Sequence, residues 1–203
     1  MAKHDPKAIQ IMKDFVEGRM SIQDFKVQFD KNPIMKNTFA IYPNRPLKTE
    51  CGYDYIPYME KKDINTRGGA LCWQGFIEEF LKLNNYPCTP TEEYSRRFIF
   101  LLQIQPGWLD ITDETFLNEQ IISKMPVGLT EPKQIKWCKD RIKELFRYDA
   151  RPPRWVQSSE WPIVNSKPLV FKGQSKTQKD DERVYFYFYD PDTGVEETVT
   201  QMY

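Results

Sequence analysis

Apolar residues recur at helical spacing through the first three quarters of the chain. Between Lys7 and Val16 they return every three or four positions, which predicts a helix that ends at Gly18. Ser21 is a suitable N-cap for a second helix, which Pro33 ends. The proline-rich segment Tyr42–Asn65 predicts an irregular loop with at most one short strand.

Further helices are predicted up to about residue 150. One begins with a capping box, in which Thr89 is the N-cap and Glu92 the third helical residue. Its centre, residues 98–102, is apolar on all sides, so we expect this helix to be central in the fold. The same periodicity predicts helices over residues 70–85, 114–125 and 131–148.

After Ala150 the pattern changes to the alternation that is typical of strands. Strands are predicted at "LVFKG", "VYFYFYD" and "VEETVTQMY", and the "DPDTG" segment that ends at Gly194 predicts a hairpin turn. The two faces of the middle strand cannot both be buried by the helices, and the pattern does not say which one is. One face carries Val184, Phe186 and Phe188, and the other carries Tyr185, Tyr187 and Tyr189.

The order of these elements predicts an α+β fold. Residues 1–150 form a helical region, and residues 151–203 form a small antiparallel sheet. About fifty residues make a thin sheet, so we expect it to pack against the helices as one compact unit.

Composition and charge narrow the classes of function. Lys and Arg (29) balance Asp and Glu (29), so no overall field attracts nucleic acid or anionic lipid. No apolar run reaches the ~18 residues of a membrane span, and the opening residues lack a secretion signal. The four cysteines form no CxxC pair, which favours reduced thiols over zinc or disulfides. We expect a cytoplasmic protein without a metal or another cofactor.

Candidate catalytic residues are few. His4 is the only histidine and lies in a segment expected to fray, which argues against catalytic triads, Cys–His dyads and His-based metal sites. Carboxylates keep one alternative open, a hydrolase or nuclease that uses a divalent metal. The candidate groups are Glu78-Glu79, Glu92-Glu93, Asp180-Asp181-Glu182 and Asp190-Asp192.

A second alternative is a protein that binds single-stranded nucleic acid. The three tyrosines of the middle strand can form a stacking platform, and the helix over residues 131–148 carries a basic stripe. However, residues 155–203 hold five Lys or Arg against eight Asp or Glu, and such a surround repels phosphate. We therefore expect no nucleic-acid partner. The basic stripe consists of Lys136, Lys139, Lys143 and Arg147.

Two tryptophans stand six positions apart between prolines, in "RPPRWVQSSEWP". Trp155 and Trp161 can supply the area that a small sheet needs for its core. They can also be exposed anchors of a partner interface, where Trp, Tyr and Arg dominate. The candidate partner-binding residues are Trp155, Trp161, Tyr185, Tyr187, Tyr189 and the four residues of the basic stripe.

Two segments, residues 15–35 and 151–201, carry a family resemblance. The order "PPRWVQSSEWPIVNSKPLVFKGQ … YFYFYDPDTGVEETVTQ" and the opening "FVEGRMSIQDFKVQFDKNPIM" are similar to uncharacterised bacterial cytosolic proteins near polymorphic-toxin loci. Some of these are suspected immunity proteins. The resemblance implies a non-catalytic protein that binds and blocks one cognate toxin. Its motifs are structural, so it assigns no binding residue.

Overall fold

The computed structural model describes residues 4–40, 55–176 and 182–203, and its fold is α+β, as the sequence predicts. Two compact units make up the chain, Met1–Ile99 and Phe100–Tyr203. The change from helices to strands that the sequence predicts at Ala150 lies inside the second unit. Composition changes at Ala150, but the helices after residue 100 bury their apolar faces with the sheet.

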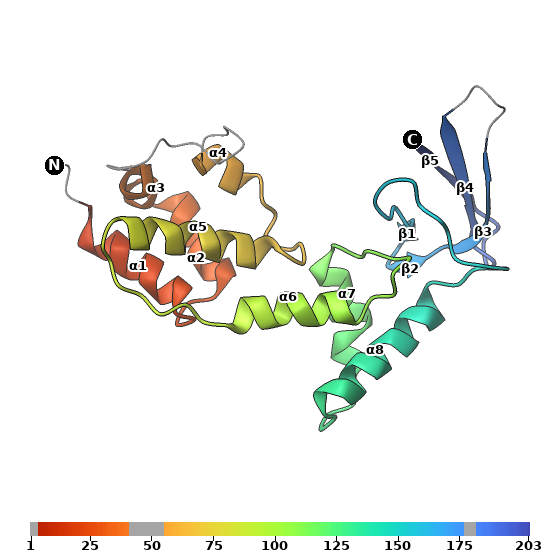
Figure 1. The fold of residues 1–203 in the computed structure, drawn as a ribbon, viewed down its shortest axis with the longest axis horizontal. Coiled ribbons are helices and arrows are strands. Elements are labelled where there is room, and N and C mark those ends of the chain that lie inside the picture. The colour runs from red at the N-terminus through yellow and green to blue at the C-terminus, as the bar shows by residue number, and fades with distance from the viewer. Residues whose placement is uncertain (1–3, 41–54, 177–181) are drawn as a thin grey trace. The chain divides into compact units, whose positions relative to one another are not determined.

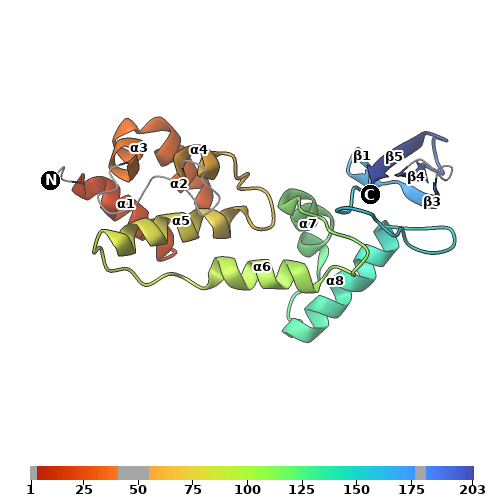
Figure 2. The same ribbon diagram turned by 45° about the horizontal axis from the view of Figure 1, so that its top comes forward.

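In its described residues the first unit contains α1 to α5 and the start of α6, and Figures 1 and 2 both show α1 lying alongside α5. Asp5 caps α1, because its side chain accepts a hydrogen bond from the Ala8 N–H. The predicted loop Tyr42–Asn65 contains α4 in its described part, while residues 41–54 lie outside the described residues. The helices are α1 (Pro6–Val16), α2 (Ile22–Lys31), α3 (Pro33–Ala40), α4 (Tyr55–Glu60) and α5 (Gly69–Leu83).

Aromatic side chains dominate the core of the first unit. Phe15 and Phe25 stack with ring centroids 4.4 Å apart, and Phe29 meets Trp73 edge-on at 5.2 Å. The buried amide of Gln74 donates to two carbonyl oxygens, those of Val16 (3.0 Å) and Thr91 (2.9 Å). The amide thus ties α5 to the chain that follows it.

His4 is not frayed, contrary to expectation. Its side chain is buried, and its Nδ1 lies 3.1 Å from the hydroxyl of Tyr86. The ring also packs edge-on against Phe80. The histidine therefore belongs to the packing of the first unit.

Helix α6 (Glu93–Gln103) begins three residues later than the capping box predicts. The Glu92 carbonyl accepts the first helical hydrogen bond, from the Arg96 N–H (2.9 Å), because the N–H of Thr91 is bonded to Val16 O and the Thr91 hydroxyl accepts from the N–H of Glu93 (3.3 Å). The apolar centre of α6 is not buried on all sides: Leu101 is buried, but Ile99 and Leu102 are exposed.

In its described residues the second unit combines the end of α6, the short helix α7, a 3-10 helix and the longer helix α8 with two antiparallel sheets. The larger sheet has the order β3-β4-β5, and the smaller one pairs β1 with β2 (Figure 1). The helical elements are α6 from Phe100 onward, α7 (Glu114–Gln120), η1 (Ile122–Lys124) and α8 (Glu131–Leu145). The strands are β1 (Ile163–Val164), β2 (Lys167–Pro168), β3 (Val170–Lys176), β4 (Arg183–Tyr189) and β5 (Glu196–Met202).

The alternation predicted for β4 is confirmed. Val184, Phe186 and Phe188 are buried against the helices, and the three tyrosines lie on the outer face. The predicted hairpin turn is also present, and Gly194 adopts φ +73°, a conformation that favours glycine. The inner face shares one core with α8, which contributes Cys138 and Ile142, and with Phe146, the residue that caps α8.

Candidate functional site

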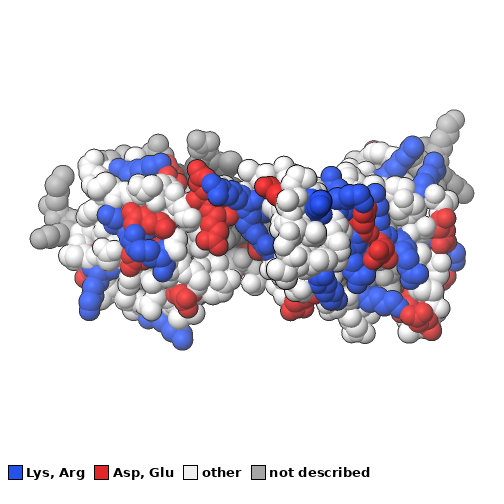
Figure 3. All heavy atoms as spheres, turned by 90° about the horizontal axis from the view of Figure 1, so that it is seen from below, with Lys and Arg blue, Asp and Glu red and all other residues white. Residues whose placement is uncertain are grey.

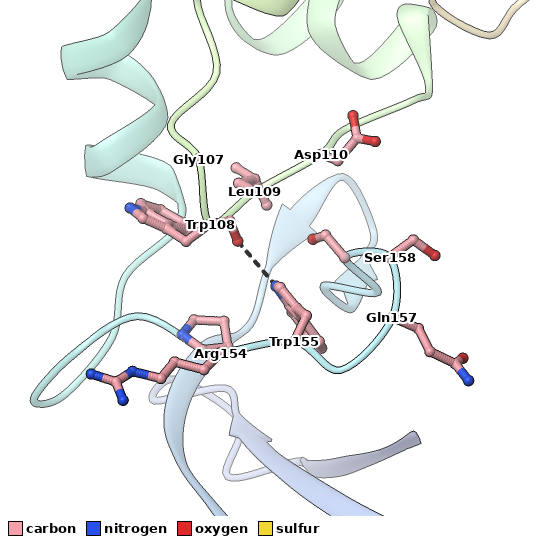
Figure 4. Close-up of a pocket in the computed structure, with 10 residues that line it drawn as sticks. Gly107, Trp108, Leu109, Asp110, Arg154, Trp155, Gln157 and Ser158 are labelled. Carbon is pink, nitrogen blue, oxygen red and sulfur yellow. Dashed lines mark hydrogen bonds between the residues drawn. The ribbon is translucent and has the colours of Figure 1, made fainter. Parts of the chain in front are cut away.

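A hollow of the second unit lies beside Trp155, and we call it the tryptophan pocket (Figure 4). It is an open cavity of about 640 Å³. One wall is the chain that follows α6, and the other is the loop between the two tryptophans. The lining residues are Gly107, Trp108, Leu109, Asp110, Pro153, Arg154, Trp155, Gln157, Ser158 and Ser159.

Trp155 is the aromatic base of this pocket and is half-buried. Its ring packs on Phe186 with centroids 4.5 Å apart, and its Nε1–H donates to the carbonyl of Trp108 (3.0 Å), so the indole bridges the two walls. Figure 4 shows Arg154 and Gln157 extending to opposite sides of it. Core packing and partial exposure are therefore combined in one side chain.

Trp161 lies in the core. It is 8 % exposed, its Nε1–H donates to the carbonyl of Leu169 (2.8 Å), and its ring contacts Phe146 and Phe188 at 5.4 and 5.3 Å. An exposed anchor is thus not the role of Trp161, because the small sheet needs the indole to fill the space against α8.

A glutamine side chain holds the first wall. The amide nitrogen of Gln105 donates to the carbonyls of Leu101 (3.0 Å) and Ile111 (3.2 Å), and its amide oxygen accepts from the Ile111 N–H. Between Gln105 and Ile111 the chain makes a turn in which the Leu109 N–H donates to Pro106 O (3.0 Å). Gln105 thus replaces the backbone partners that a strand would supply.

Two more glutamines hold the second wall. Gln174 on β3 accepts from the Arg154 N–H (2.8 Å) and donates to the Arg154 carbonyl (3.3 Å). Gln201 on β5 is 2 % exposed, accepts from the N–H groups of residues 156 and 157, and donates to Ser158 O (2.7 Å). Sequence reasoning missed these roles. The available signal was a polar residue, Gln201, on the inward face that it shares with Val199.

The pocket's chemistry is suited to binding. Arg154 and Ser158 are exposed at its rim, and Asp110 stands on the opposite wall. The Ser159 hydroxyl is buried and has no hydrogen-bond partner among the described residues. This hydroxyl is sealed from solvent, so the polar contacts open to a bound group come from the rim residues Arg154 and Ser158. The pocket can therefore receive an apolar side chain and orient it by polar contacts.

On the outer surface of the large sheet, β4 presents three tyrosines, which we call the tyrosine face: Tyr185, Tyr187 and Tyr189. Tyr187 is 38 % exposed, and its hydroxyl lies 2.9 Å from the Ser175 hydroxyl. The Tyr189 hydroxyl donates to Asp149 (3.0 Å), and this bond to a carboxylate raises the pKa of Tyr189. These three rings lie on the side of the sheet opposite the buried Phe186 and do not line the tryptophan pocket.

The basic stripe is exposed along α8 and just beyond it. Lys136 pairs with Asp140 (2.6 Å), and this hydrogen bond holds the pKa of Asp140 below its usual range. Figure 3 shows acidic and basic side chains interspersed on the face seen from below, rather than a broad region of one sign. None of the four stripe residues lines the tryptophan pocket.

Four of the candidate carboxylates have local cationic or backbone partners. Glu78 pairs with Lys82 and Glu92 with Arg96 along helical turns. Asp190 and Asp192 share Lys167, and Asp190 also accepts from the backbone of its own turn. Asp180 and Asp181 lie outside the described residues. Over residues 4–40, 55–176 and 182–203, no three His, Cys, Asp or Glu side chains gather as a metal site.

Three comparisons bear on identity. Searches against protein-family models, curated proteins and solved structures found no match to this chain. Within the described residues, no helix is both long and apolar enough to cross a membrane. The resemblance to immunity proteins therefore stays an expectation, and function is argued from the pocket itself.

Proposed function

We propose that this chain is a non-catalytic protein-binding module that engages its partner through the tryptophan pocket. The observation that carries the proposal is the half-buried indole of Trp155 at the base of an open cavity of about 640 Å³. Tryptophan is among the residues that contribute most to binding energy at protein interfaces, above all where surrounding contacts exclude water.

The surroundings of Trp155 support this role. Arg154 and Ser158 supply a polar rim around the indole, which is the usual arrangement at interfaces. Phe186 and the Trp108 carbonyl already hold the indole in one conformation. Binding would therefore cost little further side-chain entropy at Trp155. A partner protein that inserts an apolar side chain over Trp155 fits these features.

The finer form of the proposal is an immunity-like role in a bacterial cytoplasm, in which the partner is one cognate toxin that binding blocks. This form depends on the resemblance in residues 15–35 and 151–201. Balanced charge is compatible with a protein partner and does not favour nucleic acid.

The test fills the pocket without removing any core contact. Ser158→Trp places a bulky ring on the rim, and Glu160→Trp is the matched control, because Glu160 is exposed and does not line the pocket. Tagged full-length variants capture partners from a nuclease-treated native lysate at moderate salt. The captured protein is then purified, and its affinity is measured by calorimetry.

We expect Ser158→Trp to weaken binding about 30-fold, the equivalent of ~2 kcal/mol and of one hot-spot residue. Glu160→Trp should bind like the wild type, and Trp155→Ala should lose affinity while keeping its far-ultraviolet circular dichroism spectrum. Equal affinities for Ser158→Trp and the wild type would exclude the pocket as the interface. Failure to capture any stoichiometric protein, with the neighbouring genes expressed, would count against a protein-binding function.

A further inference from the structure

Strand β5 forms one edge of the large sheet, and hydrogen bonds at both ends of the β4–β5 pair show which of its residues face β4. At one end the Tyr203 N–H donates to Glu182 O (3.1 Å), and at the other the Asp190 N–H donates to Val195 O (2.8 Å). In an antiparallel pair, every second residue of a strand bonds to the neighbouring strand through its N–H and C=O groups, and the residues between point these groups outward. Tyr203 and Val195 both bond to the β4 side, so the odd-numbered residues of β5 bond to β4. The outward N–H and C=O groups belong to Glu196, Thr198, Thr200 and Met202.

Most of these outward groups have no protein partner. Within the described residues, only the Met202 carbonyl has one, the side-chain amide of Gln157 (3.0 Å). The opposite edge of the sheet is covered by the chain itself. There Phe171 exchanges backbone hydrogen bonds with Arg147 and Asp149, and the Gln174 side chain bonds to Arg154.

Three of the devices that keep an edge strand from pairing are missing from β5, and its charged residues, Glu196 and Glu197, lie at one end only. The strand holds no lysine and no proline, and it pairs with β4 residue for residue without a bulge. Its centre, Thr198-Val199-Thr200, has high β-propensity, and both threonines are exposed. Such an edge is a template for one more antiparallel strand.

We infer that the occupant of this edge is β5 of a second copy of the chain, related by a two-fold axis at Val199. The centre of β5 is palindromic about Val199, so the axis places Thr198 opposite Thr200 of the partner. In this register the outward backbone groups of Thr198 and Thr200 bond to each other across the axis. It is also the two-fold register that sets all seven residues of β5 opposite β5 of the second copy, and at its ends the Gln157 amide and the second copy compete for the Met202 carbonyl.

Charge selects the antiparallel arrangement. Glu196 and Glu197 lie at one end of β5, and the other end is neutral, with Gln201 and Met202. The two-fold register sets the glutamates of one copy opposite the neutral end of the other. A parallel arrangement in register would place the glutamates beside each other, and like charges directly opposite destabilise a pair of strands. The two sheets then join into one continuous sheet, and Val199 meets its own symmetry mate on the inner face.

Charged substitutions test both the edge and the register. Thr198→Lys combined with Thr200→Lys sets lysine opposite lysine across the axis, whereas Thr198→Lys combined with Thr200→Glu sets lysine opposite glutamate. Both threonine side chains are exposed. The two double variants differ only at position 200, which faces the second copy in this register. Sedimentation velocity of the full chain over a concentration series measures the dimer dissociation constant.

We expect the wild type and the Lys/Glu variant to dimerise, and the Lys/Lys variant to dimerise at least about tenfold more weakly. A wild type that stays monomeric at its highest soluble concentration would overturn the inference. So would a Lys/Lys variant that dimerises as strongly as the Lys/Glu variant. Hydrogen exchange of the wild type adds a measurement that needs no variant: the Thr198 and Thr200 amides should lose protection on dilution, and unchanged protection would contradict the pairing.

Discussion

At the residue scale, polar side chains replace missing backbone partners in the second unit. Gln105, Gln174 and Gln201 each use both ends of the amide to bond to main-chain groups. Trp155 and Trp161 each satisfy their single donor with a carbonyl. A side-chain amide can do this because it carries the same donor and acceptor as a peptide unit. The irregular walls of the tryptophan pocket are therefore held in place without regular secondary structure.

The first prediction at this scale concerns Trp161. Trp161→Ala should lower the free energy of unfolding by about 3–5 kcal/mol, because it removes a buried ring that contacts α8 and β4. Trp161→Phe should cost less, since it keeps an aromatic ring and leaves only the Leu169 carbonyl without its donor. Urea unfolding monitored by circular dichroism checks both values. A loss below ~1 kcal/mol for the alanine variant would contradict the core role.

At the scale of elements, the turn between β4 and β5 shows how a short motif defines a strand pair. Gly194 supplies the positive φ, and the Asp190 carboxylate accepts from the Asp192 N–H (2.9 Å) and the Thr193 hydroxyl (3.0 Å). Lys167 at the start of β2 then bonds to both aspartates. Asp190 and Asp192, which the sequence offers as a candidate metal-binding pair, therefore stabilise the turn and connect it to β2.

This turn should respond to pH. The Asp192 N–H, the Thr193 hydroxyl and Lys167 hold the pKa of Asp190 below its usual 3.8. The stabilisation is therefore present above that usual pKa and is lost as the pH falls through the lower pKa of the folded state. Carbon-13 NMR titration of the carboxylates should show this low pKa. Lys167→Met should raise it only in part, because the Asp192 N–H remains, and an unchanged pKa would mean that Lys167 does not interact with Asp190 in solution.

At the scale of the whole molecule, each unit has its own core. One cluster of buried apolar residues lies within residues 8–81, and the other lies within residues 101–188. Helix α6 runs across the division, and its buried residue, Leu101, belongs to the second cluster. Since no buried residue belongs to both clusters, we expect damage to one core to stay within its unit.

Gly69 allows this expectation to be tested. A Cβ at Gly69 would overlap the Asp63 carbonyl, so Gly69→Ala should destabilise the first unit by about 1–3 kcal/mol. Gly75→Ala on the same helix is the matched control, because its Cβ meets open space and should stabilise α5 by up to ~1 kcal/mol. Hydrogen exchange should show faster exchange in α1, α2 and α5 of the Gly69 variant and unchanged exchange in β3–β5. Equal loss of protection in both units would contradict independent cores.

What the sequence determined by itself is the local structure. Periodicity, N-caps and turn residues predicted most helices, the alternation of β4 and the Gly194 turn, because these depend on neighbours within a few residues. The exceptions arose where residues distant in sequence compete: the Thr91 N–H is bonded to Val16 O, and α6 begins at Glu93 instead of directly after Thr89. Likewise, His4 is ordered by residues more than seventy positions away.

The tertiary structure alone decided which surfaces are buried and where the candidate site lies. The even-numbered residues of β4 face the core because they pack against the apolar face of α8. The alternation in sequence does not say which face of β4 is buried, because both faces of the strand are apolar or aromatic. Trp155 and Trp161 have the same residue type and lie six positions apart, yet Trp161 is core and Trp155 also lines a pocket. The pocket walls come from segments more than forty residues apart, and glutamine amides join them to their surroundings. Such long-range contacts depend on the folded geometry, which no local pattern encodes.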